Sequence, residues 1–283
     1  MQTKQSVTNS NIRSTVVAAF GLLTTFLPVS QTAHAQGDTG KDFVAPVVFQ
    51  AAGANAASIQ SAVDAFRTAL GGVNNLNNAG PLMTGRREIN WDGGNPAIVA
   101  TTAPVTPFNT FLNTRGAQFT TPGIGLSQAT PAGLAVLFNN PTYANIFTTF
   151  SPSRLFTPVG SDTTDGLFFV PGSNGAIPAV VRGFGAVFTD VDQPDGSGPG
   201  KKLDRKASTL IEFFDRNGKL LSSSTIAPSP GDGSLSFFGA VFNDARIARV
   251  RIITDEAPGR NDDAKHDIVV MDDFIYGEPQ LLH

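Results

Sequence analysis

Three aspartates follow one another closely in one stretch of the chain, Asp190, Asp192 and Asp195, and Gly196 comes directly after them. Calcium binds several oxygen ligands, usually carboxylates together with backbone carbonyls. The stretch is therefore similar to a calcium loop, although it lacks the regular Asp-x-Asp-x-Asp-Gly spacing and a closing glutamate. The alternative interpretation is an acidic, solvated hairpin loop.

A second acidic feature interrupts the last apolar stretch, where Asp272 and Asp273 stand side by side in an expected strand from 267 to 277. Side chains alternate between the two faces of a strand. One carboxylate is therefore expected on the face of Phe274 and the other on the face of Met271. At least one must be buried, and a buried carboxylate needs an arginine, several N–H groups or a metal.

Two uses of Asp272 and Asp273 stay open. The first is calcium binding at this end of the sheet, close to the acidic residues 262, 263 and 267. The second is pairing with an arginine, because a strand arginine beside a buried carboxylate forms a two-pronged ion pair. Arginines of this kind occur in or beside the expected strands, at positions 86, 87, 182, 249 and 251.

The sequence gives little support for other catalytic chemistry. It contains no cysteine, so disulfides and thiolate metal sites are excluded. Neither a Gly-x-Ser-x-Gly elbow nor a His-Glu-x-x-His motif occurs. A glycosidase needs only two carboxylates at a fixed separation, and the 23 acidic residues do not reveal which pair that would be.

The elements expected around these residues are mainly short strands. An amphipathic helix is predicted from about Ala56 to Leu70, because Ile59, Val63 and Phe66 share one face with Leu70. We interpret this face as packed on the sandwich, with partner binding as the alternative. Apolar stretches separated by Gly, Pro, Asp and Asn follow, which favours an antiparallel β-sandwich. The expected strands in the second half are 166–170, 179–191, 208–214, 220–226, 235–243, 248–254 and 268–276.

Aromatic residues are dominated by phenylalanine, with 22 Phe against two Tyr and one Trp. Phenylalanine has no polar tip, so most of these rings are expected to fill a core. Two similar strands, Phe184–Asp190 and Phe238–Asp244, are expected to point Phe inward and to use Gly for a close neighbour. Trp91 is interpreted as a core anchor, and a sugar-stacking platform is the alternative.

The first 35 residues predict a secretory signal peptide. Lys4 and Arg13 precede an apolar stretch from Val16 to Val29, and Ala33-His34-Ala35 then suits cleavage before Gln36. Residues 36–283 are expected to form a single β-sandwich domain, secreted or periplasmic. The net charge of −3 argues against nucleic acid as the main partner. No membrane association is expected after cleavage.

Three segments carry a resemblance to known proteins: Val-Val-Met-Asp-Asp-Phe-Ile-Tyr-Gly (269–277), Phe-Gly-Ala-Val-Phe-Thr-Asp (184–190) and Gly-Arg-Arg-Glu-Ile-Asn-Trp-Asp-Gly (85–93). Together they resemble a group of uncharacterised bacterial secreted proteins, over roughly residues 43–280. The closing strand also looks like that of extracellular jelly-roll modules, including carbohydrate-binding ones. That resemblance implies a structural calcium held by Asp272 or Asp273, with Glu88 or Asp92 as the distant partner.

The expectation from the sequence is a jelly-roll-like antiparallel sandwich with one packed helix. Its expected role is that of an exported binding or matrix module for polysaccharide, with structural calcium. One alternative is a carboxylate-dependent glycan hydrolase or lyase on the same sandwich, and another is a purely structural surface protein.

Overall fold

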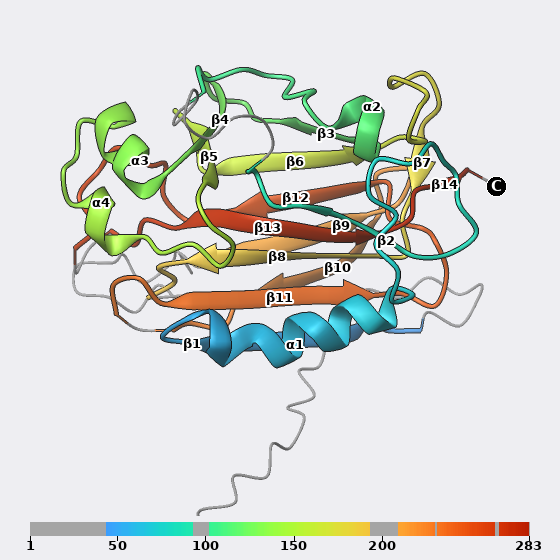
Figure 1. Ribbon diagram of the computed structural model, residues 1–283, viewed down its shortest axis with the longest axis horizontal. Coiled ribbons are helices and arrows are strands. Elements are labelled where there is room, and N and C mark those ends of the chain that lie inside the picture. The colour runs from blue at the N-terminus through green and yellow to red at the C-terminus, as the bar shows by residue number, and fades with distance from the viewer. Residues whose placement is uncertain (1–43, 93–101, 193–208, 230, 264–265, 283) are drawn as a thin grey trace, which may run out of the picture. The chain divides into compact units, whose positions relative to one another are not determined.

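The last long strand, β13 (Val270–Gly277), runs through the middle of the larger sheet (Figure 1). This computed structural model describes residues 44–92, 102–192, 209–229, 231–263 and 266–282. All of them belong to one compact unit, Ala33–His283. The predicted signal peptide and Asp195 lie outside the described residues.

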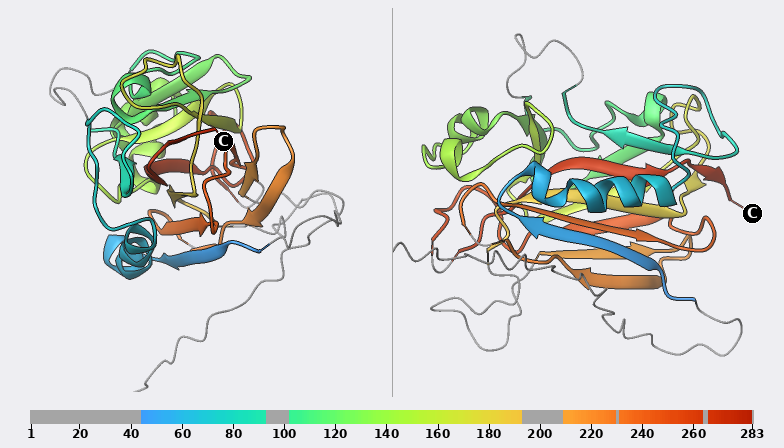
Figure 2. Two further views of the ribbon diagram at one scale, coloured as in Figure 1. Left: turned by 90° about the vertical axis from the view of Figure 1, so that its right-hand side faces the viewer. Right: turned by 60° about the horizontal axis from the view of Figure 1, so that its bottom comes forward.

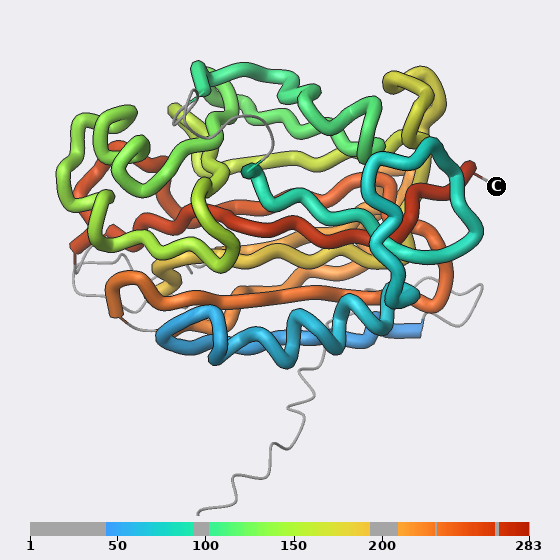
Figure 3. Tube along the Cα trace, viewed as in Figure 1, coloured from blue at the N-terminus to red at the C-terminus, as the bar shows by residue number. Residues whose placement is uncertain are grey.

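Both main sheets are antiparallel. In the larger sheet β13 pairs with β8 on one side and with β2 and β5 on the other, as the tube in Figure 3 shows. In spatial order this sheet contains β1 (Val47–Gly53), β11 (Leu235–Val241), β8 (Gly183–Thr189), β13, β5 (Leu155–Val159) and β4 (Gly125–Ala129), with β2 (Arg86–Ile89) beside β13. The smaller sheet contains β10 (Leu220–Thr225), β9 (Leu210–Phe214), β12 (Arg249–Ile253), β6 (Thr163–Phe168) and β3 (Ala117–Thr120).

The short elements lie at the two ends of these sheets. Helices α3 (Pro131–Leu137) and α4 (Tyr143–Ile146) lie at the left of Figure 1. The strand pair β7 (Ala179–Val180) and β14 (Gln280–Leu281) lies at the right, and α2 (Leu112–Arg115) precedes β3. The predicted mainly-β, antiparallel sandwich with a packed helix is therefore confirmed.

The core between the sheets is rich in phenylalanine, as predicted. Phe184 and Phe188 of β8 and Phe238 of β11 meet Phe213 of β9 and Phe168 of β6 across the sandwich. All five are at most 2% exposed. Burying a side chain of this size stabilises the fold by roughly 1.5–3 kcal/mol, so this layer makes a large contribution to stability.

The predicted helix is α1 (Ala56–Ala69), which lies across the outer face of the larger sheet (Figure 2, right). Asn55 caps it by accepting a hydrogen bond from the Ser58 amide. Phe66 packs over Gly185 and Gly239, which pair with each other across β8 and β11. A Cβ on Gly239 would come within 2.7 Å of the Phe66 ring, so the expected close neighbour of the repeated strands is this helix.

A β-bulge in β13 overturns the expected alternation of Asp272 and Asp273. Met271 pairs with Phe188 and Phe274 pairs with Ala186, so β13 has one more residue than β8 between these pairs. Met271 and Phe274 consequently both face the sandwich core, and Ile275 faces α1. The two carboxyls do not point to opposite faces, because both hydrogen-bond the same residue, Ser151.

Candidate functional site

Five aspartates gather at the end of the larger sheet where β8 ends and where β11 and β13 begin. Asp190 and Asp192 follow β8, Asp232 precedes β11, and Asp262 and Asp267 precede β13. Strand β8 is antiparallel to both neighbours, so its end meets their beginnings. We call these five residues the aspartate cluster. The two acidic stretches that the sequence presented separately are thus brought together.

Asp190 is the most unusual member of the cluster. It is 0% exposed, and neither carboxylate oxygen has a hydrogen-bond partner among the described residues. Its backbone has a φ of 70°, in the left-handed region that residues with a side chain rarely adopt. Burial, reinforced by the charges of the other four aspartates, raises its pKa to about 9. A buried carboxyl without a partner costs stability unless a cation or donors are supplied.

The other members of the cluster tie the three loops to one another. Asp192 accepts a hydrogen bond from the Gly231 amide at 2.9 Å, and its own amide donates to Asp267 at 3.4 Å. Asp262 accepts from the Ile268 amide at 2.9 Å. Burial nevertheless raises the pKa of Asp262 to about 6. The loops therefore concentrate negative charge in a partly water-excluded region.

The chemistry of the cluster suits a hard cation. Calcium takes six to eight oxygen ligands, including waters and carbonyls, in a flexible geometry. Within the described ranges, no three His, Cys, Asp or Glu side chains stand in an arrangement that could hold a metal ion by themselves. Carboxylates repel one another when no cation lies between them, so a bound ion would have to draw these loops together.

Asp272 and Asp273 form a second carboxyl group, separate from the aspartate cluster. The nearby charges that influence Asp273 belong to Arg67 and Glu88, and those that influence Asp190 belong to the cluster. Asp272 accepts hydrogen bonds from backbone amides, which is one of the three partners expected from the sequence. No arginine hydrogen bond to either carboxyl is found among the described contacts.

Glu88, one of the predicted distant partners, lies on β2 beside β13, Asp92 follows that strand, and both have hydrogen-bond partners of their own. Glu88 forms an ion pair with Arg67 at 2.9 Å. Asp92 accepts hydrogen bonds from the amides of Ser153 and Arg154 at 2.5 and 2.9 Å. Each therefore has a positional role: Glu88 joins β2 to α1, and Asp92 holds the turn before β5.

Sequence reasoning missed Asp232 as a member of the cluster. Its only local signal is its place between Gly231 and Gly233, a turn directly before an apolar strand. Both glycines have positive φ angles, 106° and 74°. The same pattern occurs in many turns, so membership in the cluster depends on the strand order.

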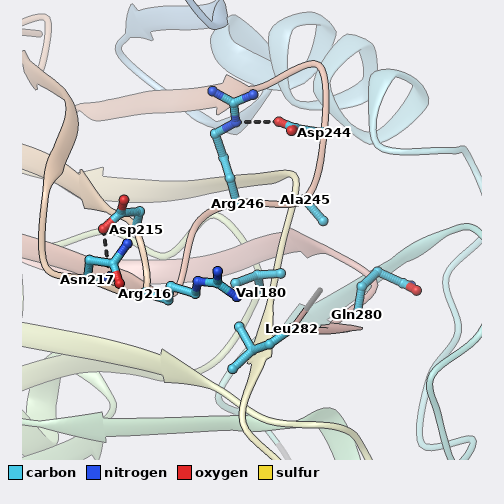
Figure 4. A pocket seen from close by; sticks show the side chains of 9 residues that line it. All are labelled: Val180, Asp215, Arg216, Asn217, Asp244, Ala245, Arg246, Gln280 and Leu282. Atoms are coloured by element: carbon cyan, nitrogen blue, oxygen red, sulfur yellow. Dashed lines mark hydrogen bonds and ion pairs between the residues drawn. The ribbon is translucent and has the colours of Figure 1, made fainter. Parts of the chain in front are cut away.

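A pocket of about 440 Å³ lies at the opposite end of the sheets, where β8 begins and β11 and β13 end (Figure 4). Its lining combines polar and charged residues with apolar ones. Asp244 and Arg246 form an ion pair there, and Asp215 accepts a hydrogen bond from the Asn217 amide at 2.8 Å. Val180, Ala245 and Leu282 contribute apolar surface. Polar side chains beside small apolar patches suit a hydroxylated ligand.

Among the described residues, no helix combines the length and the apolar character that crossing a membrane requires. Comparisons of the chain with family models, with curated proteins and with solved structures gave no match.

Proposed function

We propose that this protein is an exported β-sandwich module that calcium stabilises at the aspartate cluster. The observation that carries the proposal is Asp190, a fully buried carboxyl that faces four further aspartates and has no hydrogen-bond partner among the described residues. All five ligand candidates are carboxylates, and the chain has no cysteine. Hard oxygen donors on loops favour calcium over softer metals and over magnesium, which requires a stricter octahedral geometry.

Calcium is expected to raise the melting temperature of the purified protein relative to EDTA. A cation at 100 times its Kd stabilises a folded protein by about 2.7 kcal/mol, and each kcal/mol shifts the Tm by about 2–4 °C at this size. In Asp190→Asn the response to calcium should be lost. In EDTA this variant should be at least as stable as the wild type, because asparagine folds without the proton uptake that a carboxyl with a raised folded-state pKa requires at neutral pH.

The matched control for this experiment is Asp165→Asn, which removes a carboxylate from the ion pair with Arg251 on the smaller sheet. This control should keep the full calcium response. An equal response in wild type and Asp190→Asn, or no response in either, would contradict the proposed site.

We further propose that the ligand is a polysaccharide and that it binds at the pocket at the opposite end of the sheets. The supporting observation is the pocket's size and its lining by side chains that hydrogen-bond hydroxyl groups, including Asn217, Arg246 and Gln280. The alternatives are a carboxylate-dependent glycan hydrolase or lyase, and a structural surface protein.

Pull-down on a panel of insoluble glycans tests this ligand. We expect the protein to be retained without turnover, and Arg246→Ala to weaken retention about five- to tenfold, the effect of losing one hydrogen bond. Arg249→Ala, on the smaller sheet, should bind normally. Release of sugar would favour the enzyme, and self-assembly without retention would favour the structural protein.

A further inference from the structure

The bulge in β13 places two buried carboxyls on the same side of one strand. Asp272 is 0% exposed and Asp273 is 3% exposed. Burial, followed by the influence of Asp273, raises the pKa of Asp272 well above its usual range. Burial also raises the pKa of Asp273, to about 6. This pair is separate from the five aspartates of the proposed calcium site.

The hydrogen bonds to this pair come from one segment, residues 147–154 between α4 and β5, which we call the latch segment. The amides of Phe150 and Ser151 donate to Asp272 Oδ2 at 2.5 and 3.3 Å. The Ser151 hydroxyl donates to Asp273 Oδ1 at 2.5 Å. Asp272 Oδ1 has no hydrogen-bond partner among the described residues. One oxygen of the pair is therefore left without a partner beside a second carboxyl.

The neighbouring charges do not neutralise a doubly ionised pair. From α1, Arg67 faces Asp273, but this guanidinium already forms a two-pronged contact with Glu88 at 3.1 and 2.9 Å. Arg67 also contacts Asp64 at 3.0 Å. From β2, the charge of Glu88 opposes ionisation of Asp273. On the latch segment, the backbone amide of Arg154 donates to Asp92, and the Arg154 guanidinium is not among the main influences on the pKa of Asp272 or Asp273.

Two adjacent carboxylates in a buried site repel each other strongly, and a shared proton removes that repulsion. We infer that Asp272 and Asp273 share one proton in the folded protein, and that this proton holds the latch segment against the larger sheet. With the proton present, the acid of one residue donates to the carboxylate of the other. The remaining oxygens accept the three hydrogen bonds from Phe150 and Ser151.

The sign of the pH dependence follows from the raised pKa values. An acid whose pKa is higher in the folded state stabilises the fold at low pH, and that stability is lost as the pH rises through the folded-state pKa. The second proton of the pair leaves first: the rise of the Asp273 pKa from 3.8 to about 6 corresponds to a roughly hundredfold change in the folding equilibrium constant over the full range. About tenfold of this falls between pH 5 and pH 8. The shared proton leaves at higher pH, because the pKa of Asp272 is raised well above its usual range.

Urea unfolding of wild type and Asp272→Asn between pH 5 and pH 8, both in EDTA, tests the inference. The asparagine oxygen can accept the two backbone hydrogen bonds, and its NH₂ can donate permanently to Asp273. Between pH 5 and pH 8, the factor by which the folding equilibrium constant falls should be at least ten times larger for the wild type than for Asp272→Asn. This variant should also be the more stable protein at pH 8. Asp190 and Asp262 titrate in both proteins, so their contributions cancel.

A parallel fall of both proteins with pH, or a less stable Asp272→Asn at pH 8, would overturn the inference. A measurement without the Asp272 substitution covers the case in which that variant does not fold. In Asp190→Asn, the infrared band of an un-ionised carboxylic acid should persist at pH 8. Its absence there would also overturn the inference.

Discussion

Replacing Arg87 by methionine is expected to destabilise the protein by about 3–5 kcal/mol, the usual effect of removing one partner of a buried ion pair. Arg87 and Glu278 are 0% and 4% exposed. Their side chains meet through two hydrogen bonds of 2.6 and 2.7 Å. The same guanidinium donates to the carbonyls of Leu76 and Asn78. Its loss therefore leaves the buried Glu278 carboxylate without a cation, with only the Asn75 side chain and the Leu82 amide as donors, and removes the donor from both loop carbonyls.

Urea unfolding at pH 7 measures this effect. Two further variants serve as controls for it. Arg251→Met removes an arginine from a more exposed pair with Asp165 and should change stability by no more than about 1 kcal/mol. The double variant Arg87→Met/Glu278→Gln should recover part of the loss, because no unpaired charge then stays buried. If Arg87→Met unfolded within 1 kcal/mol of the wild type, the pair would not stabilise this end of the sheet.

The parts of the fold that depend on local periodicity could be predicted from the sequence. The apolar face of α1 and the inward Phe residues of β8 and β11 follow from spacing along the chain. The bulge at Asp272 could not, because strict alternation is the expectation for any strand until its partner is known. The short helices α3 and α4 could not either, because each is too short to show an amphipathic period.

The candidate site was predictable only in pieces. Asp190 and Asp267 are far apart in sequence, and only the antiparallel order of β8 and β13 brings their loops together. The pairing of Arg87 with Glu278, 191 positions apart, depends on the same order. The carboxylates and arginines were recognisable as residues that need partners, but their partners are set by topology.

Trp91→Ala is the second substitution expected to have a large effect, a loss of about 3–5 kcal/mol. Trp91 is 0% exposed and stacks on Phe156 with ring centroids 3.8 Å apart. The edge-to-face contact with Phe274 has a centroid distance of 5.0 Å. The indole N–H donates to the Asp272 carbonyl at 2.9 Å, inside the bulge. The residue thus joins the aromatic core to the strand at the centre of the larger sheet.

The stability of Trp91 variants distinguishes the two interpretations of this residue, a core anchor and a sugar-stacking platform. Trp91→Phe keeps a ring but loses the N–H bond, so about 1–2 kcal/mol should be lost. As a control, Phe214→Ala removes a half-buried ring that lies beneath Arg249, and it should cost less than Trp91→Ala. Trp91 is the only tryptophan, so its fluorescence in the wild type should shift to longer wavelength together with the loss of secondary structure. A stacking platform would give the opposite result for Trp91→Ala, with unchanged stability and weaker glycan retention. The full burial of the indole argues against this, because it leaves no face on which a sugar could stack.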